Sequence, residues 1–261
     1  MKQPQYHIIF RTCDLVHSLH NTPRPFDLDK RSLIKCCFKS LYNAVRDYPH
    51  SITILGDRLS DELKQFFADY NVTMLNEELG NDASIRRTIE LALERPDDEW
   101  VYFCEDDYLH TPESFLWMND LIANREQYID SHRYLGNSLF GSKKDIGPVP
   151  LIIHPPDYPD RYSRPLNFSL LFLTKYCHWR QIVNTTFTFM MQARTVKQYK
   201  EILFKSVKGA NDGYLSDHLY ASTKLGSKAL CLSPIPGIAT HMHEEVMTPL
   251  VDWERIYRQY I

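Results

Sequence analysis

The chain has 261 residues and a formal net charge of −3, with 43% hydrophobic and 24% charged residues, which is ordinary for a globular protein with a large core. No overall basic field points to nucleic acid, so no nucleic-acid partner is expected. The six cysteines form neither a CxxC pair nor a zinc spacing, no secretory signal is visible, and no apolar run approaches the ~20 residues that span a bilayer. We therefore expect a cytoplasmic protein.

The first half of the sequence alternates strand-like runs with helical patterns. Strands are expected near residues 6–10, 51–55, 72–75 and 100–104, and helices near 33–48, 61–70 and 83–93. This alternation predicts an α/β fold with a mostly parallel central sheet flanked by helices. Such sheets bind ligands at the carboxyl ends of their strands.

The second half is less regular. Residues 147–165 hold six of the fifteen prolines and are expected to form an ordered surface excursion. Residues 184–191 are rich in β-formers and are expected to rejoin the sheet. Further elements are expected as helices at 114–124, at 196–204 and near Asp217, and as a strand at 229–232.

Three consecutive carboxylates end the expected strand at 100–104. Glu105, Asp106 and Asp107 follow a buried apolar run directly, so their mutual repulsion and desolvation are costly. A divalent cation with oxygen ligands would relieve that cost. A solvated acidic turn is the alternative, and these residues alone do not decide between the two.

Polar side chains also follow the other expected strands. Arg11 and Asp14 lie at the end of the first strand and Asp57 at the end of the second, where they suit a ribose or a base edge or serve as ordinary turn residues. The helix after Gly80 begins with side chains that can meet phosphate oxygens, namely Asn81, Ser84 and Arg87.

The last fifty residues supply further acidic and imidazole groups. Asp212 and Asp217 lie around a helix start, and His241 and His243 follow a proline-containing turn. A histidine from this pair can complete a metal site begun by Asp107, because imidazole binds Mn²⁺. A structural role for these histidines is equally compatible with the sequence.

Together these motifs resemble the GT-A fold of nucleotide-sugar-dependent glycosyltransferases, in particular its inverting, bacterial polysaccharide-type (family 2-like) enzymes. The resemblance covers nearly the whole chain. It implies a single domain at 1–261, with a nucleotide-sugar-binding half at 1–110 and an acceptor-binding and catalytic-base half at 111–261.

The carboxylate cluster looks like the family's DxD motif, with Glu105 and Asp107 in its outer positions. The segment Ser216–Leu219, followed by Gly226 and later His241, is similar to the family's acidic helix start, glycine and late histidine. The sequence departs from the family at two points. A glutamate opens the DxD-like motif, and Ser-Asp replaces the usual Glu-Asp pair at the helix start.

The resemblance implies transfer of a sugar from a nucleoside diphosphate donor to a hydroxyl of a glycan or lipid-linked acceptor, with Mn²⁺ or Mg²⁺ on the diphosphate. Its implied metal ligands are Glu105, Asp107 and His241. Its implied catalytic base, acting with inversion, is Asp217, with Asp212 as a rival. Its implied donor contacts are Arg11, Asp14, Asp57, Asn81, Ser84, Arg87 and Asp106.

The acceptor is expected to bind the second half of the chain. Tyr162, Trp179 and Thr186 are candidate walls, because aromatic faces suit the CH faces of sugars, with core packing as the alternative for the aromatic pair. The C-terminal stretch 251–260 combines apolar and arginine residues. It is either a docked terminal helix or a peripheral membrane contact.

Three other functions fit parts of the pattern. A metal-dependent phosphohydrolase also uses Asp and His clusters, and a carbohydrate-binding protein can keep the fold without turnover. A sugar-phosphate nucleotidylyltransferase is expected to have a glycine-rich loop after the first strand, and residues 11–19 contain no glycine.

Overall fold

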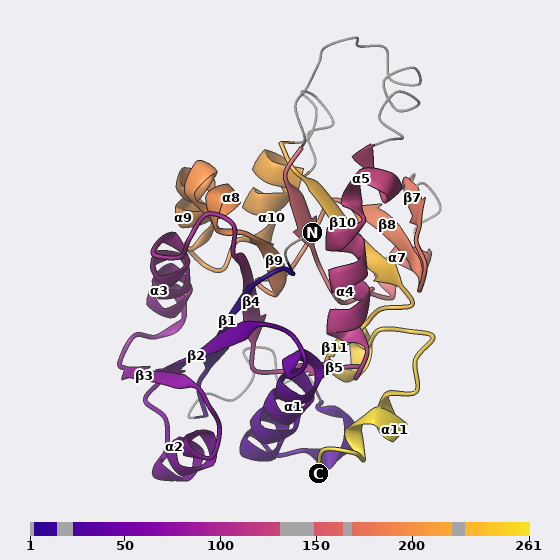
Figure 1. Cartoon of the computed structure of the whole chain (residues 1–261). Helices are drawn as coiled ribbons and strands as arrows, with labels where there is room; N and C mark the ends of the chain where they lie inside the picture. The colour runs from indigo at the N-terminus through magenta and orange to yellow at the C-terminus, as the bar shows by residue number, and fades with distance from the viewer. Residues whose placement is uncertain (1–2, 15–22, 131–148, 164–168, 221–227) are drawn as a thin grey trace.

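The computed structural model describes residues 3–14, 23–130, 149–163, 169–220 and 228–261. Gly226, which the family resemblance includes, lies outside these residues. Figure 1 shows the elements in space. In chain order they are β1 (Tyr6–Thr12), η1 (Pro25–Asp27), α1 (Lys30–Val45), β2 (His50–Asp57), α2 (Asp61–Ala68), β3 (Thr73–Glu77), α3 (Asn81–Leu93), β4 (Trp100–Glu105), β5 (Tyr108–His110), α4 (Ser114–Ala123), α5 (Arg125–Tyr128), β6 (Leu151–Ile153), α7 (Asp160–Ser163), β7 (Leu171–Leu173), β8 (His178–Ile182), β9 (Phe189–Gln192), α8 (Ala193–Gln198), α9 (Lys200–Ser206), α10 (Asp212–Leu215), η3 (Ser216–Tyr220), β10 (Leu230–Ile235), β11 (Ala239–His241), η4 (Glu244–Val246) and α11 (Trp253–Tyr257).

A nine-stranded sheet with the order β3-β2-β1-β4-β9-β6-β10-β8-β7 forms the centre of the described part of the chain. The neighbours among β1 to β4 pair in parallel, as the alternating sequence pattern predicts. Within this sheet only β9 and β8 run in the opposite direction. The fold is therefore α/β with a large, mostly parallel sheet that draws strands from both halves of the chain.

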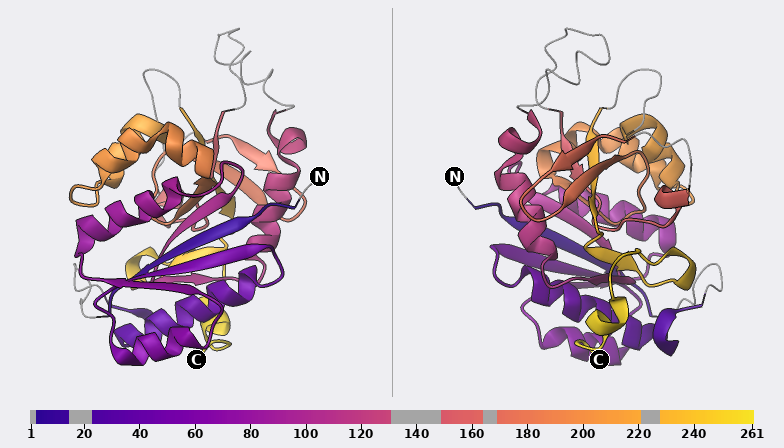
Figure 2. Two further views of the ribbon diagram at one scale, coloured as in Figure 1. Left: turned by 60° about the vertical axis from the view of Figure 1, so that its left-hand side comes forward. Right: turned by 90° about the vertical axis from the view of Figure 1, so that its right-hand side faces the viewer.

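The two faces of the sheet carry separate hydrophobic cores. Because side chains alternate along a strand, Ile8 and Phe10 of β1 enter one core and Ile9 enters the other. Helices α1, α2 and α4 cover the first core, and α3, α8, α9 and α10 cover the second. The two views of Figure 2 show the sheet between these helical layers.

Side-chain caps fix where helices α1 and α2 begin. The Asp29 carboxylate accepts hydrogen bonds from the backbone N–H groups of Arg31 and Ser32 at the start of α1. The Ser60 hydroxyl accepts one from Leu63 at the start of α2. Such caps satisfy backbone donors that have no partner within the helix, so they stabilise the first turn of each helix.

The proline-rich segment differs from the expected surface excursion. Its described part contains the buried strand β6, and the four residues from His154 to Asp157 after it are also buried. The prolines lie outside the β6 strand, which therefore keeps its hydrogen bonds to β9 and β10. The helix expected at 196–204 is divided into α8 and α9 at Tyr199.

A small second sheet joins the C-terminal segment to the end of β4. Strand β11 pairs antiparallel with β5, with His241 opposite Tyr108, and the Met242 N–H donates to the Asp107 carbonyl at 2.8 Å. This pairing brings the late histidines to the carboxylate cluster.

The C-terminal helix is docked on the body of the protein. Trp253, Ile256 and Tyr260 are buried against Leu33 and neighbouring residues of α1, which leaves its apolar residues covered. In the part of the chain that the structure describes, every helix is too short or too polar to cross a bilayer.

Candidate metal and donor site

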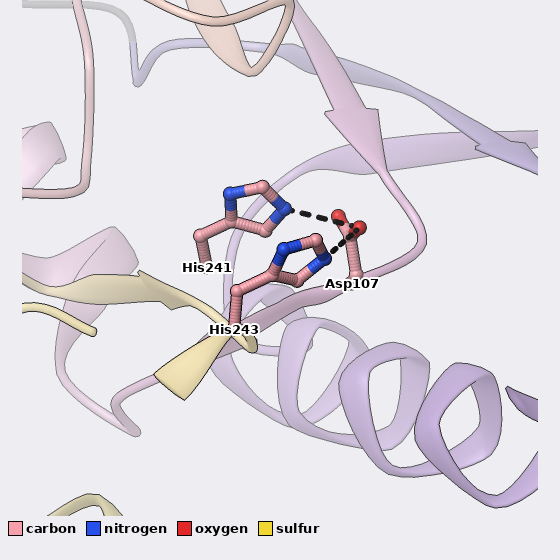
Figure 3. A group of neighbouring side chains, drawn as sticks. All are labelled: Asp107, His241 and His243. Atoms are coloured by element: carbon pink, nitrogen blue, oxygen red, sulfur yellow. Dashed lines mark hydrogen bonds and ion pairs between the residues drawn. The ribbon is translucent and has the colours of Figure 1, made fainter. Parts of the chain in front are cut away.

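Asp107, His241 and His243 form a compact group beyond the carboxyl end of β4. Figure 3 shows both imidazole rings turned toward the carboxylate of Asp107. His241 Nε2 lies 3.1 Å and His243 Nε2 3.7 Å from Asp107 Oδ2. One ligand atom from each residue falls within 4.8 Å of the others, so a single cation can reach all three.

The Asp107 carboxylate has an unusual environment. Its Oδ1 atom is buried and has no hydrogen-bond partner among the described residues. Although burial raises the pKa of Asp107, His241, His243 and Lys30 together hold it well below its ordinary value. Burial lowers the pKa of His241, but Asp107 and Glu105 raise it above its ordinary value. The group is therefore an ion pair with a spare carboxylate oxygen, which is a donor set suited to a cation.

Aromatic stacking holds His241 in place. The Tyr108 ring lies parallel to the imidazole, with 4.8 Å between the ring centroids and an angle of 9°. The Tyr108 hydroxyl is hydrogen-bonded to the Tyr158 hydroxyl at 2.6 Å and to Thr186 Oγ1 at 2.7 Å. Tyr108 is thus fixed at both its ring and its hydroxyl, and Thr186, expected on the acceptor side, lies close to the metal group.

The Asp106 side chain turns away from the metal group and contacts the carboxyl end of β1. Its Oδ2 accepts hydrogen bonds from the Thr12 hydroxyl and the Cys13 N–H, and its Oδ1 lies 2.6 Å from Lys30 Nζ. Burial lowers the pKa of Lys30, but Asp106 and Asp107 hold it above its ordinary value. Both oxygens of Asp106 are therefore engaged within the protein, so this side chain anchors the end of β4 to β1 and α1, and its expected donor contact stays a prediction.

Glu105 is also paired within the protein. Its Oε1 lies 2.5 Å from Arg11 Nη2, and its Oε2 accepts a hydrogen bond from Thr188. Among the described residues, the group of candidate metal ligands consists of Asp107, His241 and His243. It includes His243 in place of Glu105, which the family resemblance implies as a ligand. The pairing with Arg11 explains the difference, because a neighbouring guanidinium neutralises the carboxylate without a metal.

Arg11 links this cluster to the start of α3. Its Nη1 donates to Asn81 Oδ1 and to Ser84 Oγ, each at 3.2 Å. The structure therefore brings together four of the residues expected to contact the donor or metal, since Arg11 contacts Asn81, Ser84 and Glu105. Helix α3 spans 13 residues, so its N-terminus adds partial positive charge at this position.

Asp57 supports the loop that leads into α3. Its two oxygens accept hydrogen bonds from the backbone N–H groups of Leu79 and Gly80, and Arg58 pairs with the same carboxylate. Although burial raises the pKa of Asp57, these N–H groups hold it below its ordinary value. Gly80 has a φ of 77°, a conformation that glycine adopts without strain.

Two other expected donor contacts are engaged in the framework. Asp14 accepts hydrogen bonds from the Ser60 N–H and from Arg31, which tie the end of β1 to α2 and α1. Arg87 pairs with Glu77 at the end of β3. Both side chains therefore help to hold the framework around the site, and their expected donor contacts stay predictions.

The two candidate bases lie in different environments. Asp212, the first residue of α10, has its pKa raised to about 7 by burial and by the negative charge of Glu105, while Arg11 and His241 oppose that shift. Asp217 lies in the π-helical turn η3 with an exposed side chain. Asp212 is therefore electrostatically coupled to the metal group.

The residues expected to contact the acceptor also lie in different environments. Trp179 is fully buried in the core beneath β8, so it cannot touch an acceptor, and this expectation is corrected to a packing role. Tyr162 is 47% exposed and donates its hydroxyl proton to Asp157. The Arg180 guanidinium lies 4.7 Å from the Tyr162 ring.

The sequence also contains a signal for His243 as a metal ligand. Residues two apart on an extended chain point to the same side, so the spacing of His241 and His243 allows both to reach one cation, whereas the family resemblance assigns only His241 to the metal. No comparable signal identified Lys30 or Tyr108, because their roles depend on contacts between distant segments.

No family model matches the sequence, and no curated protein matches it significantly. The structure is similar to residues 1–349 of TarS from S. aureus, with 13% identity over 88% of this chain and 57% of that chain, and a TM-score of 0.46. It is also similar to the galactosyltransferase LgtC, solved with donor and acceptor sugar analogues. That match has 11% identity over 80% of this chain and 69% of that chain, and a TM-score of 0.37. The structure is similar as well to a nucleotidyl transferase from Methanothermobacter thermautotroptrophicus, with 10% identity over 98% of this chain and 97% of that chain, and a TM-score of 0.43. Glycosyltransferases and a nucleotidyl transferase are both among these likenesses, which concern the fold alone.

Proposed function

We propose that the protein is a metal-dependent glycosyltransferase that moves a sugar from a nucleoside diphosphate to a hydroxyl of a glycan or lipid-linked acceptor. The observation that carries the proposal is the group of Asp107, His241 and His243 beyond the end of β4, next to the Arg11–Glu105 pair. Ligand binding at the carboxyl ends of parallel strands is a general property of α/β sheets.

The donor set favours Mn²⁺ over Mg²⁺. Mg²⁺ prefers oxygen ligands and retains several waters, whereas imidazole is a good ligand for later divalent ions. Asp107, His241 and His243 would hold the cation, and the spare Oδ1 of Asp107 provides a fourth donor atom. When bound, the cation would neutralise the charge that develops on the leaving diphosphate.

Arg11 and the start of α3 would bind the phosphate oxygens of the donor. Arg11 is held by Glu105, Asn81 and Ser84, so its guanidinium is oriented before substrate arrives. A preorganised positive group stabilises developing charge without the cost of reorientation.

Asp212 is the base that we favour. The acceptor hydroxyl oxygen would form a bond to the anomeric carbon, the bond from that carbon to the diphosphate oxygen would break, and the hydroxyl proton would pass to Asp212. Its pKa near 7 suits a general base at neutral pH. Attack opposite the leaving diphosphate gives inversion. Asp217 remains the second candidate, and Asp217→Asn is the variant that distinguishes the two.

The products released from donor substrates test this proposal. The protein would be incubated with Mn²⁺ and a panel of UDP-, GDP-, CDP- and dTDP-sugars, and the products separated by chromatography. Free nucleoside diphosphate, formed by transfer to an acceptor or slowly to water, supports the proposal. Release of a nucleoside monophosphate and a sugar phosphate would identify a phosphohydrolase, and binding without any product would identify a carbohydrate-binding protein.

A further inference from the structure

One stretch of the chain has a charge opposite to that of the remainder. Residues 161–211 contain nine lysines and arginines but a single acidic residue, Glu201, which gives this stretch a net charge of +8. The whole chain has a net charge of −3, so the remaining residues have a net charge of −11. The far edge of the sheet is built from this basic stretch.

The β7–β8 hairpin, defined here as Leu170–Val183, forms that edge. Leu171 pairs with Arg180 and Leu173 with His178. Directly opposite residues of antiparallel strands point to the same face, so both leucines share a face with these basic groups. Phe172 points to the opposite face, where it packs against the core. The right-hand view of Figure 2 faces the side on which the hairpin lies.

The shared face is apolar and exposed. Leu171 is 56% and Leu173 66% exposed, and Tyr176 at the tip of the hairpin is exposed with Lys175 Nζ 4.8 Å from its ring centroid. Within the described residues, β7 is an edge strand of the sheet. No aspartate or glutamate occurs between residues 169 and 183. Arg180 is neutralised by the buried Asp157 carboxylate, so Lys175 is the exposed cation beside the leucines and Tyr176 of the hairpin.

We propose that the β7–β8 hairpin docks on an anionic lipid surface, with its leucines among the acyl chains and Lys175 at the level of the headgroups. Apolar and aromatic residues next to basic groups are what membrane interfaces bind. Pairing of β7 with the same strand of a second copy is the alternative occupant, and self-association of the protein would reveal it. The C-terminal helix cannot supply this contact, since its apolar residues pack on α1.

Vesicle sedimentation with the full chain tests the proposal. One set of vesicles contains phosphatidylcholine and phosphatidylglycerol, and the other contains phosphatidylcholine alone. We expect binding to the first set, and we expect the double variant Leu171→Asp/Leu173→Asp to reduce it roughly tenfold or more. Leu250→Asp is the matched control, because Leu250 is 71% exposed and lies outside the hairpin. It should leave binding unchanged.

Three results would overturn the proposal. They are failure of the unmodified chain to bind either vesicle, equal loss of binding in the Leu250→Asp control, and self-association that the double variant abolishes while vesicle binding is absent. The thermal midpoint of each variant, measured by circular dichroism, reports whether it is folded. The readout is independent of the metal group, so the proposed transferase activity and the docking surface can fail separately.

Discussion

Asp107 presents one carboxylate oxygen to two histidines and leaves the other without a hydrogen-bond partner among the described residues. We expect Asp107→Asn to weaken Mn²⁺ binding at least tenfold, because an amide carries no charge to offset that of the cation. Isothermal titration with Mn²⁺ measures this change. Glu244→Gln is the matched control, since Glu244 is an exposed acidic residue of η4 directly after His243, and an equal loss in both variants would contradict the assignment.

Asp212 allows a pH prediction at the same scale. A base with a pKa of about 7 is active only when deprotonated, so the rate of transfer should fall as the pH drops through about 7. Asp212→Asn should abolish transfer, whereas Asp217→Asn should retain both the activity and its acid limb. The opposite pattern would assign the base to Asp217.

The same shift has a consequence for stability. The folded pKa of about 7 lies above the ordinary value of 3.8, so the folded state binds the proton more tightly and stability declines as pH rises between these values. Asp212→Asn should therefore raise the free energy of unfolding at pH 8 by about 1–3 kcal/mol, with allowance for solvent screening. Urea unfolding at pH 8 checks this, and a loss of stability would show that the carboxylate is needed for the fold.

At the scale of secondary-structure elements, the pairing of β5 with β11 sets the position of His241. Tyr108 stacks on this imidazole and is bonded through its hydroxyl. Tyr108→Phe keeps the stacked ring and should change Mn²⁺ affinity little, whereas Tyr108→Leu should lower it about tenfold, because residues that orient a metal ligand tune its affinity. Equal affinities in the two variants would remove any role for the stacking.

Asp106 connects β4, β1 and α1. Its removal leaves Lys30 without a partner in a mostly buried position, since that side chain is 18% exposed. We expect Asp106→Ala to cost about 3–5 kcal/mol of unfolding free energy, measured by urea denaturation. Asp61→Ala is the control because its side chain is 99% exposed. A cost below 1 kcal/mol would mean that solvent replaces the ion pair.

The strands and helices of the first half follow from local patterns. Apolar runs at 6–10 and 100–104 became β1 and β4 because both are buried on two faces, which requires continuous apolar residues. The site was less accessible to such reasoning. His241 lies beside Asp107 although 134 positions separate them, and the Arg11–Glu105 pair, which neutralises Glu105, joins residues 94 positions apart. Contacts of this range are not encoded in local periodicity.

At the scale of the whole molecule, charge is distributed unevenly along one continuous sheet. The candidate metal site lies between the acidic turn after β4 and the C-terminal histidines, whereas the far edge of the sheet belongs to the basic stretch 161–211. No overall basic field is visible in the sequence, because the net charge of −3 conceals the two opposite contributions.

Linked binding of a metal and a nucleotide is the most direct test of the central claim. The thermal midpoint would be measured with UDP, GDP, CDP and dTDP, each with and without Mn²⁺. At a hundredfold excess over Kd a ligand stabilises the folded state by about 2.7 kcal/mol, which corresponds to a rise of several degrees. We expect at least one nucleotide to raise the midpoint only when Mn²⁺ is present, and Asp107→Asn to abolish the rise. If no nucleotide shifts the midpoint with or without Mn²⁺, the group of Asp107, His241 and His243 does not bind a nucleotide-bound metal, and the proposed function is wrong.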